Sequence, residues 1–116
     1  MHAIHTRVQE LIQSMTVREK IAQLVSAWLE IEVDGTFGVR EFGVKERPEG
    51  DRRADVLGNG IGQLTRPYGT MAHDPRQQAK GINAVQHYLV TETRLGIPAM
   101  LHEECLTGAM TRGATI

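Results

Sequence analysis

The run His102-Glu103-Glu104-Cys105 places an imidazole, two carboxylates and a thiol directly after the apolar residues 97–101. We expect residues 97–101 to form a strand buried on both faces, as strands of parallel sheets are. Parallel sheets and barrels bind their ligands at the carboxyl ends of such strands. The run is therefore a candidate binding site. The alternative, which stays open, is a loop that becomes solvated as it leaves the core, with acidic residues capping the next helix.

Three other kinds of chemistry fit this run less well. His102 and Cys105 lack the paired spacing of zinc ligands, and Leu106 stands where a His-Glu-x-x-His motif needs histidine, so we expect no metal and no cofactor. Cys105 has no histidine base fixed beside it, and we expect a small buried thiol. Glu103 and Glu104 would point to opposite faces of a strand, which argues against a cooperating catalytic pair.

The second half of the chain is predicted to form a strand, a helix and a strand. Residues 59–64 form the first strand, in which Gly62 would let another backbone approach closely. A helix then begins after Asp74 as N-cap, with Pro75 at its first position. It ends before Gly96, with Arg94 expected in its last turn. Residues 97–101 return as the second strand, and the crossover length suits a right-handed parallel unit.

The first third is predicted to form two helices. The second helix begins at Thr16 with a capping box completed by Glu19, and its apolar positions run to Trp28. Residues 32–53 are rich in glycine and charge and predict a long loop, with a short helical turn near residues 51–57. Trp28 and Phe37 are interpreted as core residues rather than sugar-stacking platforms.

Composition excludes several classes of protein. The 116 residues fit one small domain, and a net charge of −1 argues against nucleic-acid binding. No stretch approaches the ~20 apolar residues that a membrane span needs. Cys105 is the only cysteine, and the first residues lack the pattern of a secretion signal, so we expect a reducing, cytoplasmic compartment.

Three segments resemble glycoside hydrolase family 3, in particular its β-glucosidase and β-xylosidase group. The longest is TRLGIPAMLHEECLTG at 93–108, followed by RGAT at 112–115. The segment GIGQLTR at 60–66 is similar to the family's first barrel strand and the loop after it. The segment MTVREKI at 15–21 is similar to its leader helix. The resemblance implies an α/β fold, an incomplete (β/α)8 TIM-barrel fragment. Its leader helices would occupy residues 1–30, an irregular loop 31–58, and the first parallel βαβ unit 59–116.

The resemblance also implies roles for single residues. Glu104, four residues before Gly108, matches the family's acidic residue that hydrogen-bonds the sugar next to the scissile bond. Glu103 and His102 would orient Glu104 or contact another hydroxyl, and Arg66 would reach the same pocket. The family often has histidine where this chain has Thr107, which leaves the specificity open.

The resemblance implies a β-glucoside or β-xyloside as ligand, but no catalytic residue in this chain. The family's nucleophile and acid/base lie on later parts of a barrel that takes ~250 residues. We therefore expect the chain alone to be inactive. We also expect it to be marginally folded, to associate with itself, or to need the remaining barrel from another chain. Two alternatives stay open: a catalytically inactive sugar-binding module and a structural protein-interaction module.

Overall fold

The computed structural model describes residues 2–39, 52–67, 74–105 and 108. Its elements are α1 (His2–Ser14), α2 (Val17–Ala22), β1 (Ser26–Ile31), β2 (Phe37–Val39), α3 (Arg53–Leu57), β3 (Gln63–Thr65), α4 (Pro75–Glu92) and β4 (Met100–His102). They form an α/β structure around a four-stranded sheet in the order β2-β1-β3-β4. Strands β1, β3 and β4 are parallel, and β2 is antiparallel to β1.

Helix α4 begins as the sequence predicts. The Asp74 side chain accepts hydrogen bonds from the backbone N–H groups of Arg76 and Gln77, and the Gln77 side chain accepts one from the Asp74 N–H. This reciprocal arrangement satisfies amides that the first helical turn leaves without partners. Gly96 has the expected left-handed conformation, with φ 60°. Arg94, however, lies beyond the helix, which ends at Glu92, so its placement in the last turn was wrong.

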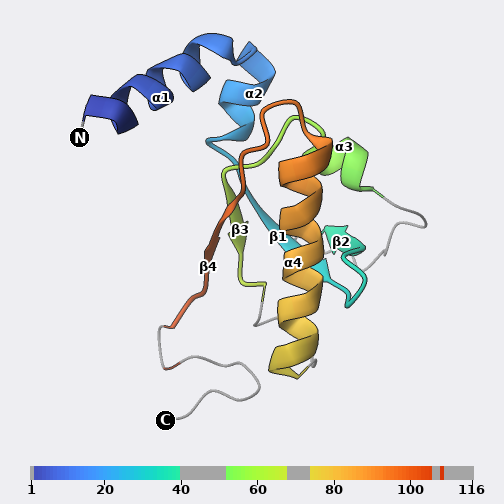
Figure 1. Cartoon of the computed structure of the whole chain (residues 1–116). Coiled ribbons are helices and arrows are strands. Elements are labelled where there is room, and N and C mark those ends of the chain that lie inside the picture. The colour runs from blue at the N-terminus through green and yellow to red at the C-terminus, as the bar shows by residue number, and fades with distance from the viewer. Residues whose placement is uncertain (1, 40–51, 68–73, 106–107, 109–116) are drawn as a thin grey trace.

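The core lies between α4 and one face of the sheet (Figure 1). Alternate residues of the strands point to this face, because side chains of a strand alternate between its two sides. They include Leu29, Ile31 and Leu64, and α4 contributes Ile82, Val85 and Leu89, all at most 4% exposed. The helical spacing of the α4 residues is therefore a burial pattern, as the sequence predicts.

Strand β1 replaces the second half of a predicted helix. Helix α2 ends at Ala22, and residues 26–31 are extended, so the expectation of leader helices through residue 30 was wrong. The apolar positions here also fit a period of two, with Ala27, Leu29 and Ile31 on the α4 side. The apolar spacing thus fits both a helix and a strand. Strand pairing selects the strand, because β1 hydrogen-bonds to β2 on one side and β3 on the other.

The predicted irregular loop at 31–58 contains two regular elements among its described residues. β1 turns back into β2 through a tight turn, in which the Asp34 side chain accepts hydrogen bonds from the Thr36 N–H and hydroxyl. Gly35 in that turn has φ 83°, a conformation that favours glycine. Helix α3 confirms the predicted helical turn near residues 51–57.

The predicted parallel pairing of two strands across a helix is confirmed, but the strands are Gln63–Thr65 and Met100–His102 rather than 59–64 and 97–101, and a third strand extends the unit. β3 and β4 pair in parallel across the α4 crossover, and β1 precedes them as a further parallel strand. Gly62 allows a close backbone approach as expected: its N–H donates to the Ala22 carbonyl, and a Cβ there would collide with the Gln23 carbonyl oxygen. The expectation that residues 97–101 are buried on both faces was wrong, because Met100 points away from α4 and is 65% exposed.

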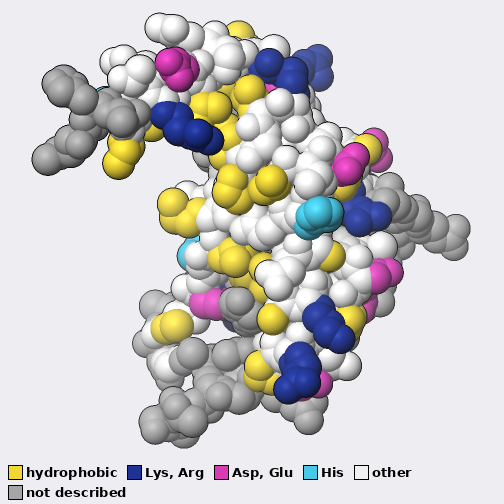
Figure 2. All heavy atoms as spheres, in the orientation of Figure 1, with side chains coloured by type: hydrophobic (Ala, Val, Ile, Leu, Met, Phe, Trp, Pro, Cys, Tyr) yellow, Lys and Arg dark blue, Asp and Glu magenta, His cyan; other side chains and the backbone are white. Residues whose placement is uncertain are grey.

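Helix α1 projects from the sheet and leaves an apolar groove of roughly 460 Å³ beside α2. The groove is lined by Val8, Leu11, Ile12, Met15, Lys20, Gln23, Leu24 and Ile97. Figure 2 shows hydrophobic side chains gathered beneath these two helices. Within the described ranges, none of the helices has the length and apolar character needed to cross a bilayer.

Candidate functional site

The sheet face opposite α4 carries a row of side chains in register. Trp28 of β1 pairs with Thr65 of β3, and Thr65 pairs with His102 of β4. Each of the three is adjacent to a residue that faces α4, so each points to the other side of the sheet. The row lies at the carboxyl ends of β3 and β4, where parallel sheets bind their ligands.

Arg66 leaves β3 in an unusual backbone conformation. Its φ is 51°, in the left-handed region, and it is the only residue other than glycine with a positive φ in the described part of the chain. Its backbone N–H donates to the His102 carbonyl oxygen at 2.8 Å, which ties it to the end of β4. Such conformations persist only where the surroundings hold them, and they often occur at functional sites.

The Arg66 side chain connects Trp28 and Glu104. Together with His102, these residues form the side-chain cluster at the ends of β3 and β4. Its guanidinium carbon lies 4.9 Å from the centroid of the Trp28 ring, which is within cation–π range. Its Nη1 lies 3.6 Å from Oε2 of Glu104. The two charged side chains are 27% and 54% exposed, so the ion pair is half open to water.

Arg66 Nε and His102 Nδ1 are buried, and neither has a hydrogen-bond partner among the described residues. Buried polar atoms usually have partners, because leaving one unpaired costs about 1–3 kcal/mol. A guanidinium N–H can donate to a ligand hydroxyl, and an unprotonated imidazole nitrogen can accept from one. The site thus offers unused hydrogen-bonding capacity next to a charged pair.

The structure brings together three of the four predicted site residues. Arg66, His102 and Glu104 meet at the ends of β3 and β4, and Glu103 follows His102 and is half-buried. Cys105 is exposed, so the expectation of a buried thiol was wrong. Thr107 and residues 112–115 lie outside the described residues.

Sequence reasoning missed Trp28 as a member of this cluster. Its interpretation as a core residue on a helix was wrong, whereas Phe37 is buried in the core as expected. Trp28 is half-buried and faces away from α4. The alternation Ala27, Leu29, Ile31 would have placed Trp28 on the opposite sheet face, had the segment been recognised as a strand.

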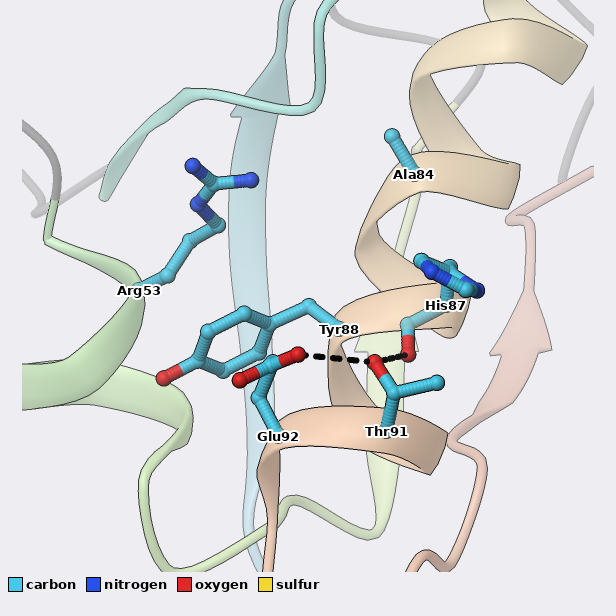
Figure 3. Close-up of a pocket in the computed structure, with 6 residues that line it drawn as sticks. All are labelled: Arg53, Ala84, His87, Tyr88, Thr91 and Glu92. Carbon is cyan, nitrogen blue, oxygen red and sulfur yellow. Dashed lines mark hydrogen bonds between the residues drawn. The ribbon is translucent and has the colours of Figure 1, made fainter.

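A second pocket, of roughly 350 Å³, lies between α3 and α4 (Figure 3). It is lined by Arg53, Ala84, His87, Tyr88, Thr91 and Glu92. The Arg53 guanidinium lies 5.6 Å from the Tyr88 ring centroid, and the Thr91 hydroxyl lies 2.9 Å from the His87 carbonyl oxygen. This pocket opens on the helical side of the sheet, away from the predicted site residues. Across the described ranges, no group of three or more metal-ligating side chains is present.

Comparison with known proteins agrees with the resemblance noted above. Residues 16–116 match the model of the glycosyl hydrolase family 3 N terminal domain. A Formosa agariphila protein bearing the name "Putative beta-xylosidase" is 30% identical over 114 residues, which cover 97% of this chain. The aligned region is 14% of that relative's length, so the chain corresponds to a small part of it.

Proposed function

Because this chain belongs to glycoside hydrolase family 3, we propose that it contributes part of a glycosidase's sugar-binding pocket and does not itself break the glycosidic bond. The observation that carries the proposal is the Arg66–Glu104 ion pair at the carboxyl ends of two adjacent parallel strands. These two charges come from distant parts of the chain and meet at the edge of the sheet where ligands bind.

The chemistry of the pair suits a polyhydroxylated ligand. A carboxylate accepts hydrogen bonds from hydroxyl groups, and a guanidinium donates to them. Because the two side chains are 27% and 54% exposed and 3.6 Å apart, their mutual attraction is screened by water and weak enough for a ligand to compete with. Arg66 Nε and His102 Nδ1 supply further buried groups for a sugar hydroxyl.

The arrangement of the sheet supports a barrel fragment as the fold. In a (β/α)8 barrel the helices lie outside, and the opposite face of the strands fills the interior in layers. Here α4 covers one face, and the other carries two rows in register: Ser26, Gln63 and Met100, then Trp28, Thr65 and His102. Exposed Met100 would be buried if further strands closed such a barrel.

The ligand that we propose is a β-xyloside or a β-glucoside. The name of the Formosa relative favours the xyloside, although the aligned region is a small part of that protein. The nucleophile and the acid/base would lie on other barrel segments, since retaining glycosidases need two carboxylates about 5 Å apart. The single cysteine is consistent with the proposed cytoplasmic location.

Titration with methyl β-D-xylopyranoside and methyl β-D-glucopyranoside, followed by amide NMR shifts, tests the proposal. We expect shifts at Arg66, His102 and Glu104. Glu104→Gln should weaken binding by about tenfold or more, because a hydrogen bond to a charged group contributes about 1.5–3 kcal/mol. Glu92→Gln, in the α3/α4 pocket, is the matched control and should leave the affinity for both glycosides unchanged.

Shifts confined to the α3/α4 pocket, or equal affinity in the Glu104→Gln variant, would contradict a sugar site at the sheet edge. A complete absence of shifts with either glycoside would favour the structural interaction module instead.

A further inference from the structure

We infer that Trp28 is a positioning residue that holds the Arg66 guanidinium over the open face of the sheet, where Arg66 and Glu104 together meet a ligand. The inference rests on the proposed function and adds a residue to the same site. Three observations carry it: the placement of Trp28 in the sheet, the backbone of Arg66, and the stacking of the two side chains.

Trp28 is fixed in an inner strand. β1 pairs with β3 through residues 26–28, which include Trp28, and with β2 through residues 29–31, so the strand that carries Trp28 lies between two neighbours. Trp28 lies directly opposite Thr65, the residue before Arg66. The Thr65 hydroxyl is also hydrogen-bonded to the Ser26 hydroxyl, which joins the two strands on the same face. The indole therefore lies beside the end of β3, on a strand with a neighbour on each side.

The backbone of Arg66 turns its side chain toward that surface. If β3 continued as a regular strand, Arg66 would alternate to the α4 side, as Leu64 does. Its left-handed φ of 51° ends this alternation, and the guanidinium instead lies 4.9 Å from the Trp28 ring centroid. A bulky residue adopts this conformation only when its contacts outweigh the strain. Here the hydrogen bond to His102, the indole and Glu104 supply those contacts.

Holding the guanidinium in place has a consequence for binding. A free arginine side chain loses many rotamers when a ligand orders it, and that entropy cost weakens binding. Stacking on Trp28 orders the Arg66 side chain before the ligand binds. Nη1 of the stacked guanidinium still lies beside the Glu104 carboxylate. Loss of the indole should therefore weaken sugar binding through Arg66, even though Arg66 and Glu104 remain in the sequence.

The contact can be tested without any ligand, because Trp28 is the only tryptophan. We expect ring-current upfield shifts of the Arg66 side-chain protons that disappear in Trp28→Leu and persist in Trp28→Phe. Arg66→Met should change the fluorescence of Trp28, whereas Arg76→Met, at an exposed position of α4, should not. Arg66 side-chain resonances that do not move in Trp28→Leu would overturn the inference.

A double-mutant cycle with methyl β-D-xylopyranoside tests the functional role. Trp28→Leu should raise the dissociation constant by roughly 5- to 30-fold, the range of a partly desolvated cation–π contact. Trp28→Phe should stay within about twofold of the unaltered chain, since it retains an aromatic ring. In an Arg66→Met background, Trp28→Leu should have no further effect.

An equal loss in both backgrounds would show that Trp28 acts independently of Arg66 and would overturn the positioning role. Circular dichroism of each variant controls for loss of fold. If Trp28→Leu unfolds, the effect of Arg66→Met on Trp28 fluorescence still tests the contact, and an unchanged fluorescence would overturn it. If the unaltered chain binds neither methyl β-D-xylopyranoside nor methyl β-D-glucopyranoside, the proposed function fails, while the ring-current experiment still decides whether Trp28 holds Arg66.

Discussion

Arg94 and Glu19, which lie 75 positions apart, form a two-point ion pair that ties α2 to the segment just after α4. Arg94 Nε lies 2.8 Å and Nη2 2.5 Å from the two carboxylate oxygens, and Nη2 also donates to the Ser14 carbonyl at 2.7 Å. The same carboxylate accepts from the Thr16 N–H in the capping box of α2. One buried glutamate therefore both starts a helix and ties it to the segment that follows α4.

This pair predicts a loss of stability in acid. Hydrogen bonding to Arg94, and then to the Thr16 amide, lowers the pKa of Glu19 from 4.5 to about 2. Because the folded-state pKa is the lower one, the stabilisation is complete above pH 4.5. It is lost progressively as the pH falls toward 2. The free energy of unfolding, measured by urea denaturation between pH 6 and pH 2, should fall across that window.

The Glu19→Gln variant isolates this effect from the other carboxyl groups. It should be less stable than the unaltered chain at pH 6, and the difference between the two should shrink as the pH falls through the window. A difference that stays constant from pH 6 to pH 2 would show that Glu19 contributes no pH-dependent stability.

Gly62→Ala should destabilise the fold by about 1–3 kcal/mol, as overpacking does. The new Cβ would collide with the Gln23 carbonyl oxygen, where the end of α2 meets the start of β3. Thermal unfolding measures the effect. Asn59→Ala, at an exposed position three residues earlier, is the control and should lie within about 0.5 kcal/mol of the unaltered chain. Equal melting temperatures for Gly62→Ala and the control would contradict the close approach.

The chain by itself should be marginally stable or self-associating. Among the described residues, Leu24 is 88%, Ile4 70% and Met100 65% exposed, and exposed apolar surface of this kind promotes association. We expect 1-anilinonaphthalene-8-sulfonate to bind and to increase in fluorescence, and size exclusion to depend on concentration. A cooperative unfolding transition of a monomer that does not bind the dye would contradict this expectation.

The isolated chain should not hydrolyse nitrophenyl β-xyloside or nitrophenyl β-glucoside. Glu104 is ion-paired with Arg66 in the described part of the chain, whereas retaining hydrolysis needs a nucleophile and a separate acid/base. Release of nitrophenol measured by absorbance checks this. Robust turnover that Glu104→Ala abolishes would place catalysis in this chain and overturn the proposal that it only binds sugar.

The sequence by itself predicted the features that depend on local chemistry. Asp74 and Pro75 start α4, and Thr16 with Glu19 starts α2, because side chains three residues away satisfy the first amides of a helix. The parallel pairing of β3 with β4 followed from the order of apolar segments. The grouping of Arg66, His102 and Glu104 was implied instead by the resemblance to family 3, and these residues lie at one edge of the sheet.

The tertiary structure decided what local pattern left ambiguous. Residues 26–31 fit both a helical and an alternating period, and only hydrogen bonding to β2 and β3 selects the strand. That choice moves Trp28 from a helix to the open face of the sheet, beneath Arg66. The left-handed backbone at Arg66 depends on contacts with His102, Trp28 and Glu104, and the ion pair of Arg94 with Glu19 joins residues 75 positions apart. Neither can be predicted from local sequence, because the partners lie far apart in the chain.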